Sequence, residues 1–111
     1  MQHDRLSDRE LKVLLAILKC GEDAYAPKIG DMLHCHSGER LSLGALHSAL
    51  DRLQDRGLIK SRMGEPTRER GGRRKKMIFV EAKGRIAVQH AMLTLNKMAQ
   101  GVVCPNGEVS V

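Results

Sequence analysis

The sequence predicts a single, mainly α-helical domain that carries a small β-hairpin. Three observations lead to this class: apolar residues recur at helical spacing in four segments, capping signals separate these segments, and β-forming residues fill two short runs after Gly57. The chain has 111 residues, of which 41% are hydrophobic and 29% charged, and this is the composition of one globular domain.

The first predicted helix begins at a capping box. Ser7 is placed as the N-cap and Glu10 at the third helical position, and Leu6 and Leu11 are spaced to form a hydrophobic staple around them. The apolar residues that follow cover more than half of the helical circumference until Gly21 ends the helix. We therefore expect this helix to be largely buried.

Two shorter helices are expected next. Asp23 is placed to cap a second helix that has Pro27 in its first turn and ends near Gly38. Ser42 is placed to cap a third helix that ends at Gly57, a residue suited to a left-handed C-terminal cap. One narrow apolar stripe runs along the third helix, formed by Leu43, Leu46, Leu50 and Leu53.

A β-hairpin follows the third helix. Residues 58–63 and 76–80 are strand-length runs, and the segment between them is polar and glycine-rich, so we expect an exposed loop. Basic residues crowd this loop and its ends: Arg68, Arg70, Arg73, Arg74, Lys75 and Lys76, with Lys60 and Arg62 beside them on the first strand.

The last predicted helix spans residues 84–100 and has two apolar faces. Ile86 and Leu93 lie on one face, and the other is expected to form a dimer interface with a second copy through Ala87, Val88, Ala91, Leu95 and Met98. The predicted domain organisation is a winged helix-turn-helix domain at 6–81, a C-terminal dimerisation helix at 82–101 and a loosely ordered tail at 102–111.

This order of elements is the winged helix-turn-helix arrangement, in which the third helix enters the major groove of DNA and the loop, or wing, reaches a neighbouring groove or the backbone. Opposite the leucine stripe, small residues and one arginine suit a close approach to bases, whereas Asp51 and Asp55 would be repelled by phosphates. The predicted DNA-binding residues are Ser42, Gly44, Ala45, His47, Ser48, Arg52, Arg68, Arg70, Gly71, Gly72, Arg73, Arg74 and Lys75.

Each of these signals also has an ordinary structural explanation. Small residues on a helix face often pack against another helix, a charged run is often only a solvated surface, and a histidine at the border of a helix face such as His47 is often half-exposed packing. The basic hairpin directly after the small-residue helix favours DNA binding over these explanations, because the net charge is +6 and clustered positive charge suits a polyanion.

The rest of the composition narrows the partner and the location. Tyr25 and Phe79 are the only aromatic residues, which is too few for the stacking surfaces that bind single strands, so duplex DNA is the expected partner. The three cysteines are odd in number and widely spaced, as in a reduced, cytoplasmic protein. We expect no signal peptide, no membrane span and no membrane partner.

The sequence resembles the PadR family of bacterial transcriptional regulators over residues 6–100. The resemblance rests on LSLGALHSALDRL at 41–53 with Gly57 and Leu58, and then on GEPT at 64–67 and ERGGRR at 69–74. It implies a homodimeric winged helix-turn-helix protein in the bacterial cytosol, associated with the nucleoid. Such a protein is usually a repressor that binds a palindromic promoter site and is released by a small molecule or a stress signal.

The sequence also departs from this family. His47 stands where the family usually has a tyrosine that helps to contact the DNA backbone, Met77 and Ile78 replace a usual aromatic pair, and one C-terminal helix replaces an extended dimerisation domain, as in short members. The chain has no tryptophan, so an effector cannot bind between tryptophans as in some members. The sequence therefore does not identify a small-molecule effector.

Other functions are weaker predictions. The run His34, Cys35 and His36 suggests a metal sensor, but consecutive helical residues diverge, and a solvated helix end with a buried Cys35 is the simpler interpretation. We find no phosphate loop, dinucleotide fingerprint or nucleophile motif, so neither an enzyme nor a cofactor is expected. The main alternative is a winged-helix adaptor that binds proteins without specific DNA binding.

Overall fold

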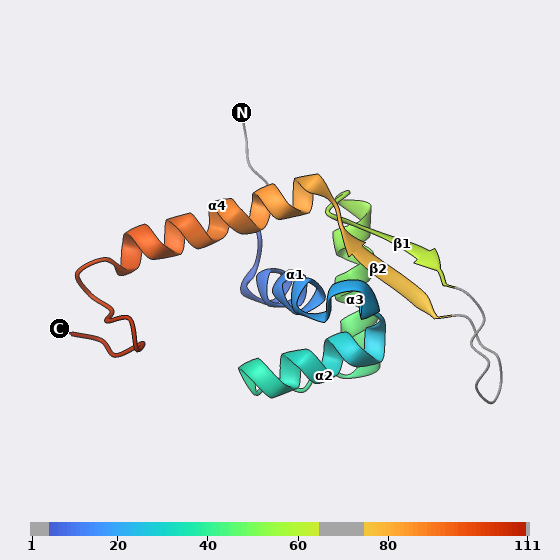
Figure 1. Ribbon diagram of the computed structural model, residues 1–111, viewed down its shortest axis with the longest axis horizontal. Coiled ribbons are helices and arrows are strands. Elements are labelled where there is room, and N and C mark those ends of the chain that lie inside the picture. The colour runs from blue at the N-terminus through green and yellow to red at the C-terminus, as the bar shows by residue number, and fades with distance from the viewer. Residues whose placement is uncertain (1–4, 65–74, 111) are drawn as a thin grey trace.

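The computed structural model describes residues 5–64 and 75–110. Within this part of the chain, the predicted order of three helices, a hairpin and a fourth helix is confirmed (Figure 1). The elements are α1 (Asp8–Cys20), a 3-10 turn (Gly21–Asp23), α2 (Ala26–Ser37), α3 (Leu43–Asp55), β1 (Ile59–Met63), β2 (Lys76–Val80) and α4 (Ala82–Ala99).

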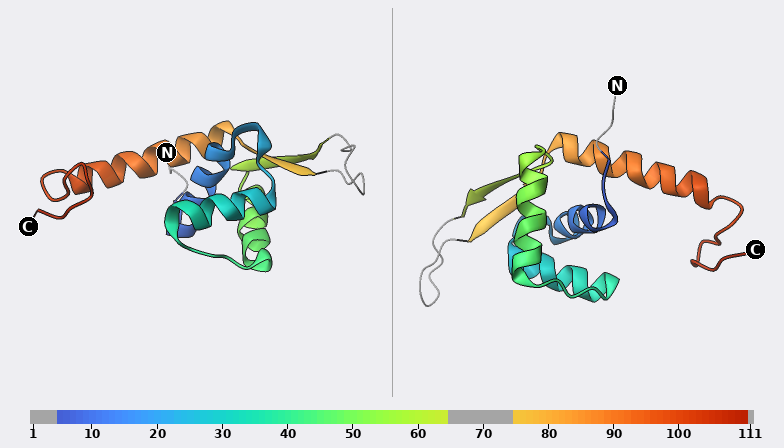
Figure 2. Two further views of the ribbon diagram at one scale, coloured as in Figure 1. Left: turned by 60° about the horizontal axis from the view of Figure 1, so that its bottom comes forward. Right: turned by 180° about the vertical axis from the view of Figure 1, so that it is seen from behind.

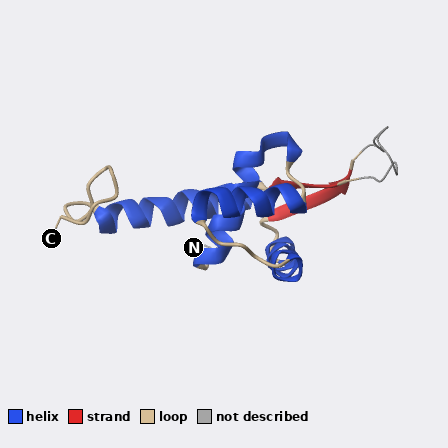
Figure 3. Cartoon of the chain, turned by 90° about the horizontal axis from the view of Figure 1, so that it is seen from below, coloured by secondary structure: helices blue, strands red, loops and turns tan. Residues whose placement is uncertain are grey.

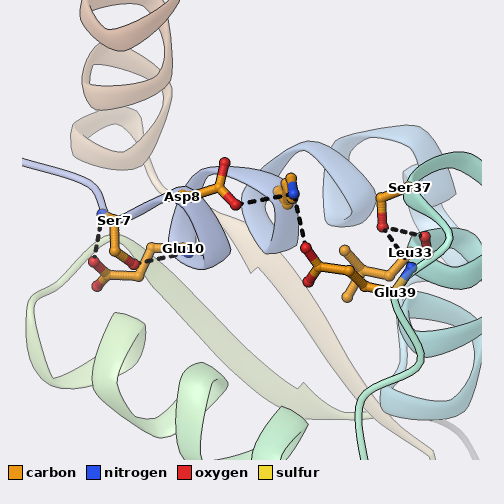
Figure 4. Close-up of polar contacts among 7 residues, drawn as sticks. Ser7, Asp8, Glu10, Leu33, Ser37 and Glu39 are labelled. Carbon is orange, nitrogen blue, oxygen red and sulfur yellow. Dashed lines mark hydrogen bonds and ion pairs between the residues drawn. The ribbon is translucent and has the colours of Figure 1, made fainter.

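Helix α1 begins at the predicted capping box. The backbone N–H of Ser7 donates to Glu10 Oε1 at 2.9 Å, and the backbone N–H of Glu10 donates to Ser7 Oγ at 3.1 Å (Figure 4). Gly21 ends the helix with a positive φ of 64°. The predicted burial of α1 is confirmed, because its core face carries the fully buried Val13 and Leu14.

Helix α2 begins later than predicted. Its N-cap is Tyr25 and not Asp23, which lies in the 3-10 turn and pairs with Lys28 at 3.4 Å. The backbone at Ala24 is extended, and its carbonyl accepts a hydrogen bond of 2.8 Å from the N–H of Ile78 in β2. This contact with the hairpin prevents the helix from starting at Asp23.

Helix α3 is capped at both ends as predicted. Ser42 Oγ accepts from the N–H of Ala45 at 3.1 Å. At the other end Gly57 has a φ of 73°, and the N–H of Leu58 donates to the carbonyl of Leu53 at 3.0 Å. Together with the bond of 2.9 Å from Gly57 N–H to the Gln54 carbonyl, this is a Schellman motif, and its two leucines are fully buried.

The apolar stripe of α3 needs one correction. Leu46, Leu50 and Leu53 are buried, but Leu43 is 61% exposed because it is the first helical residue and lies beyond the core. The core-facing side of α3 gains Ala49 instead.

Strands β1 and β2 form an antiparallel pair in which Ile59 lies opposite Val80 and Met63 lies opposite Lys76. Helix α1 occupies the centre of the domain and contacts α2, α3, β2 and α4 (Figure 2). The resulting core joins residues of all four helices and both strands within the described part of the chain.

Helix α4 is anchored at its start and leaves the body of the domain at its end (Figures 1 and 3). Gly84 is buried against the Leu58 carbonyl, and the N–H of Glu81 donates to that same carbonyl at 2.9 Å. Ala87 and Val88, one turn further along, are buried. From Met92 to the end of the helix, every residue but Ala99 is exposed.

The tail, where we expected loose order, has a defined hydrogen-bonded path. Val103 and Val109 form an antiparallel bridge, and the N–H of Ser110 donates to the carbonyl of Val102 at 2.7 Å. Gly107 has a φ of 89° in the turn between them, a conformation that glycine adopts without strain.

A polar network that the sequence reasoning missed ties α1 to the end of α3. The guanidinium of Arg56 donates to the buried carboxylate of Glu10 and to the carbonyl of Arg5, and Lys83 Nζ donates to the Arg56 carbonyl at 3.0 Å. A second link joins Lys12 to Asp8 at 2.9 Å and to Glu39 at 2.8 Å (Figure 4).

Candidate nucleic-acid interface

The first half of α3 presents an uncovered surface built mainly from small residues. Ser42, Gly44 and Ser48 are exposed, and Ala45 is half-buried. A Cβ added to Gly44 would meet nothing within 4 Å, so packing inside the protomer does not require glycine at this position. A partner could therefore approach the α3 backbone closely here, near backbone N–H groups that favour anions.

Arg52 is the cationic side chain of this surface. It is exposed and forms no ion pair with the described residues, although Asp51 and Asp55 are exposed on the same helix. A guanidinium without an internal partner remains able to bind a phosphate or a guanine edge.

The hairpin lies beside α3, as both views in Figure 2 show. Two of its cations rest on aromatic rings: Lys75 Nζ lies 4.4 Å from the ring centroid of Tyr25, and Arg62 Cζ lies 5.0 Å from that of Phe79. Such contacts orient a cation without neutralising it. Among the predicted wing residues, Arg68, Arg70, Gly71, Gly72, Arg73 and Arg74 lie outside the described residues.

Between α3, the start of α2 and the hairpin there is a cavity of about 550 Å³, called the hairpin cavity below. His47 lines this cavity together with Asp51 and Gln54, so it faces the hairpin side of α3. Gln54 Oε1 accepts a hydrogen bond from Ser61 Oγ of β1 at 3.3 Å. No sequence pattern predicts this cavity, because its walls come from segments far apart in the chain.

The predicted dimer residues of α4 fall into two groups. Ala87 and Val88 are 3% and 7% exposed because they pack into the core of their own protomer, so they offer almost no surface to a second chain, and their assignment to the interface is corrected. Leu95 and Met98, further along the same face, are 52% and 75% exposed, and Ala91 between the two groups is half-buried.

The cysteines differ in their surroundings. Cys35 is exposed, which corrects the expectation of a buried thiol, because it lies on the side of α2 opposite the buried Leu33. Cys20 is buried, and burial raises the pKa of its thiol. Among the described residues, no group of three or more histidine, cysteine, aspartate or glutamate side chains could hold a metal ion.

None of the helices in the described part of the chain has the length and apolarity that a membrane span requires.

Together, the helix-turn-helix of α2 and α3 with its adjoining hairpin and the projecting α4 define a winged helix-turn-helix domain with a C-terminal helix. No protein-family model matches the chain, and no curated protein is significantly similar to it in sequence.

Solved structures share this fold. A PadR family transcription regulator from hypervirulent Clostridium difficile R20291 has a TM-score of 0.65 at 22% identity, over 81% of this chain and 91% of that chain. A PadR family transcriptional regulator from Eggerthella lenta DSM 2243 has a TM-score of 0.65 at 21% identity, over 85% of this chain and 80% of that one. Bordetella bronchiseptica BpsR, whose DNA binding is regulated by 6-hydroxynicotinic acid, has a TM-score of 0.65 at 16% identity, over 96% of this chain and 74% of that one. The chain therefore has the winged-helix fold of PadR family regulators.

Proposed function

We propose that the protein is a member of the PadR family and a sequence-specific regulator of transcription in the bacterial cytosol, which binds duplex DNA as a homodimer and acts as a repressor at a palindromic promoter site. The observation that carries the proposal is the uncovered first half of α3, whose small residues lie beside the hairpin and one turn before Arg52, an arginine that forms no ion pair with the described residues. PadR regulators among the structural neighbours and the basic sequence at 68–76 support it.

In this proposal the two parts of the surface have different tasks. Small residues let the α3 backbone approach base edges, and Ser48 and Arg52 contact the bases. The basic wing binds phosphates and so adds affinity that does not depend on sequence. Asp51 and Asp55 keep the C-terminal half of α3 away from the phosphates, so that its N-terminal half enters the groove.

The shape of α4 supports a homodimer. A single apolar stripe is buried by the protomer's own core at its start and is uncovered at its end, where Leu95 and Met98 lie, and Leu93 is 58% exposed on another face. In the proposed dimer a second copy covers these side chains, and the two α3 helices must then lie about 34 Å apart to enter successive major grooves.

Binding is tested by fluorescence anisotropy with two labelled duplexes, the palindromic region upstream of the protein's own gene and a scrambled version of it. We expect a preference of about 10³ or more for the upstream duplex, weakened by salt. Equal and weak binding to both duplexes would contradict the proposal and favour the protein-binding adaptor.

The wing is tested by Arg73→Ala, with Arg9→Ala as the matched control because Arg9 is exposed on α1 and is not among the predicted DNA-binding residues. Arg73→Ala is expected to weaken binding to all sequences alike and to reduce the slope of log K against log salt by about 0.9 per protomer. Arg9→Ala is expected to leave the slope unchanged. An unchanged slope in Arg73→Ala would contradict a contact between the wing and the DNA phosphates.

A further inference from the structure

The hairpin cavity has the size and the lining of a small-molecule site. Its volume of about 550 Å³ falls within the usual range for such sites. Leu50, Ile59 and Ile78, all buried, form an apolar wall, and the half-buried ring of Tyr25 borders it.

The charges around the cavity favour an anion. Lys75 and Lys76 line it on the hairpin side, and Asp51 is the carboxylate that lines it on α3. The ring of Tyr25 would attract a cationic ligand, but the Lys75 ammonium already lies over it at 4.4 Å. Lys75 is therefore held at the cavity and positioned to meet a negative charge.

We propose that the hairpin cavity binds a small organic anion that has a carboxylate on an apolar body. The apolar body lies against Leu50, Ile59 and Ile78, and the carboxylate pairs with Lys75 and Lys76. Burial of the apolar body supplies affinity, and the two ammonium groups select the charged form over a neutral one.

This site has a consequence for DNA binding, and that consequence rests on the proposed function. His47 and Lys75 line the cavity and belong to the predicted DNA surface. A bound carboxylate would neutralise Lys75 and occupy the space between α3 and the hairpin, so anion and DNA would exclude each other. The ligand would act as a direct competitor, without a change in the dimer.

The chain contains its own reporter for this site. Tyr25 is the sole tyrosine and the chain has no tryptophan, so tyrosine fluorescence comes from one wall of the cavity. The probe is octanoate, with octanamide as a neutral partner of the same apolar length. Both are titrated into the full chain at constant ionic strength, first without DNA and then with the labelled upstream duplex.

We expect octanoate to change Tyr25 fluorescence saturably and to bind at least about tenfold more tightly than octanamide. Lys75→Gln is expected to reduce octanoate affinity about tenfold and to leave octanamide affinity unchanged, whereas Lys97→Gln on the exposed end of α4 is expected to change neither. With DNA present, octanoate is expected to raise the apparent Kd for DNA by a factor of one plus the ratio of the octanoate concentration to the Kd of octanoate, as mutually exclusive binding requires.

Three results would overturn the site: no saturable change with octanoate, equal affinity for octanoate and octanamide, or an unchanged affinity in Lys75→Gln. Octanoate binding that leaves DNA affinity unchanged would overturn the competition. Because the first titration contains no DNA, absence of DNA binding would overturn the proposed function and not the ligand site.

Discussion

Two glycines in the first turns of two helices allow a paired test of the fold, because the same substitution is expected to have opposite effects at them. A Cβ on Gly84 of α4 would lie 2.3 Å from the carbonyl oxygen of Leu58 and 2.9 Å from Cγ1 of Val80. A Cβ on Gly44 of α3 would meet nothing within 4 Å.

For Gly84→Ala, three contributions decide the free energy of unfolding. Overpacking against a backbone carbonyl, which cannot rotate away, costs about 2 to 3 kcal/mol. The hydrogen bond of 2.9 Å from Glu81 to the same carbonyl is disturbed at a cost of about 1 kcal/mol, and the better helix propensity of alanine returns about 1 kcal/mol. The net destabilisation is about 2 to 3 kcal/mol.

The assay is urea unfolding followed by circular dichroism at one protein concentration, because the proposed dimerisation would make apparent stability depend on concentration. Gly84→Ala is expected to lower the urea midpoint by about 1 to 1.5 M for an m-value of about 2 kcal/mol/M. Gly44→Ala is expected to raise stability by up to about 1 kcal/mol and yet to weaken DNA binding, since its methyl group occupies the proposed interface. A Gly84→Ala protein as stable as the parent would refute the packing of α4 against Leu58.

Three further predictions concern single side chains. Burial is the largest single influence on the pKa of Glu10, and it raises this pKa. Hydrogen bonds from the Ser7 backbone and the Arg56 side chain together outweigh burial, so the pKa of Glu10 lies below its ordinary value of 4.5. The ionised Glu10 therefore stabilises the fold fully above pH 4.5, and this stabilisation is lost as the pH falls below that value. In urea unfolding at several pH values, Glu10→Gln should lower the free energy of unfolding at pH 7 and lower it progressively less below pH 4.5. Leu95→Glu is expected to give a monomer in light scattering, whereas Gln89→Glu, which adds the same charge to α4, should stay dimeric. A dimeric Leu95→Glu protein would exclude the face of Leu95 and Met98 as the dimer interface. Cys35 is exposed and Cys20 is buried with a raised pKa, so mass spectrometry after brief alkylation at pH 8 should find Cys35 modified first, and the reverse order would contradict the burial assigned to α1.

The helix ends could be predicted because capping is local. Ser7 and Glu10 interact within one turn, and Gly57 closes α3 through bonds to residues just before it, so the sequence pattern is sufficient. The start of α2 could not be predicted in this way, because it depends on the hydrogen bond between Ala24 and Ile78, which are distant in the chain.

Helical periodicity predicts an apolar face but not which part of it the protomer covers. Ala87 and Leu95 belong to one stripe of α4, yet one is buried in the core and the other is uncovered, because the body of the domain ends between them. The hairpin cavity shows the same limit, since Tyr25 and Lys75 meet only after folding.

The tail carries a local turn signal. Pro105, Asn106 and Gly107 form a turn sequence between Val103 and Val109, and the bridge closes around it.

The central claim is that the exposed face of α3 reads DNA bases, and its most direct test is selection from a pool of random-sequence duplexes with the parent protein and with Ser48→Gln. Ser48 is exposed on α3, where a longer amide side chain would contact different base edges. The parent is expected to enrich a palindromic site, and the variant is expected to enrich a site that differs symmetrically at the same positions in both halves. Enrichment of no sequence by the parent, or of the same sequence by both proteins, would contradict the claim.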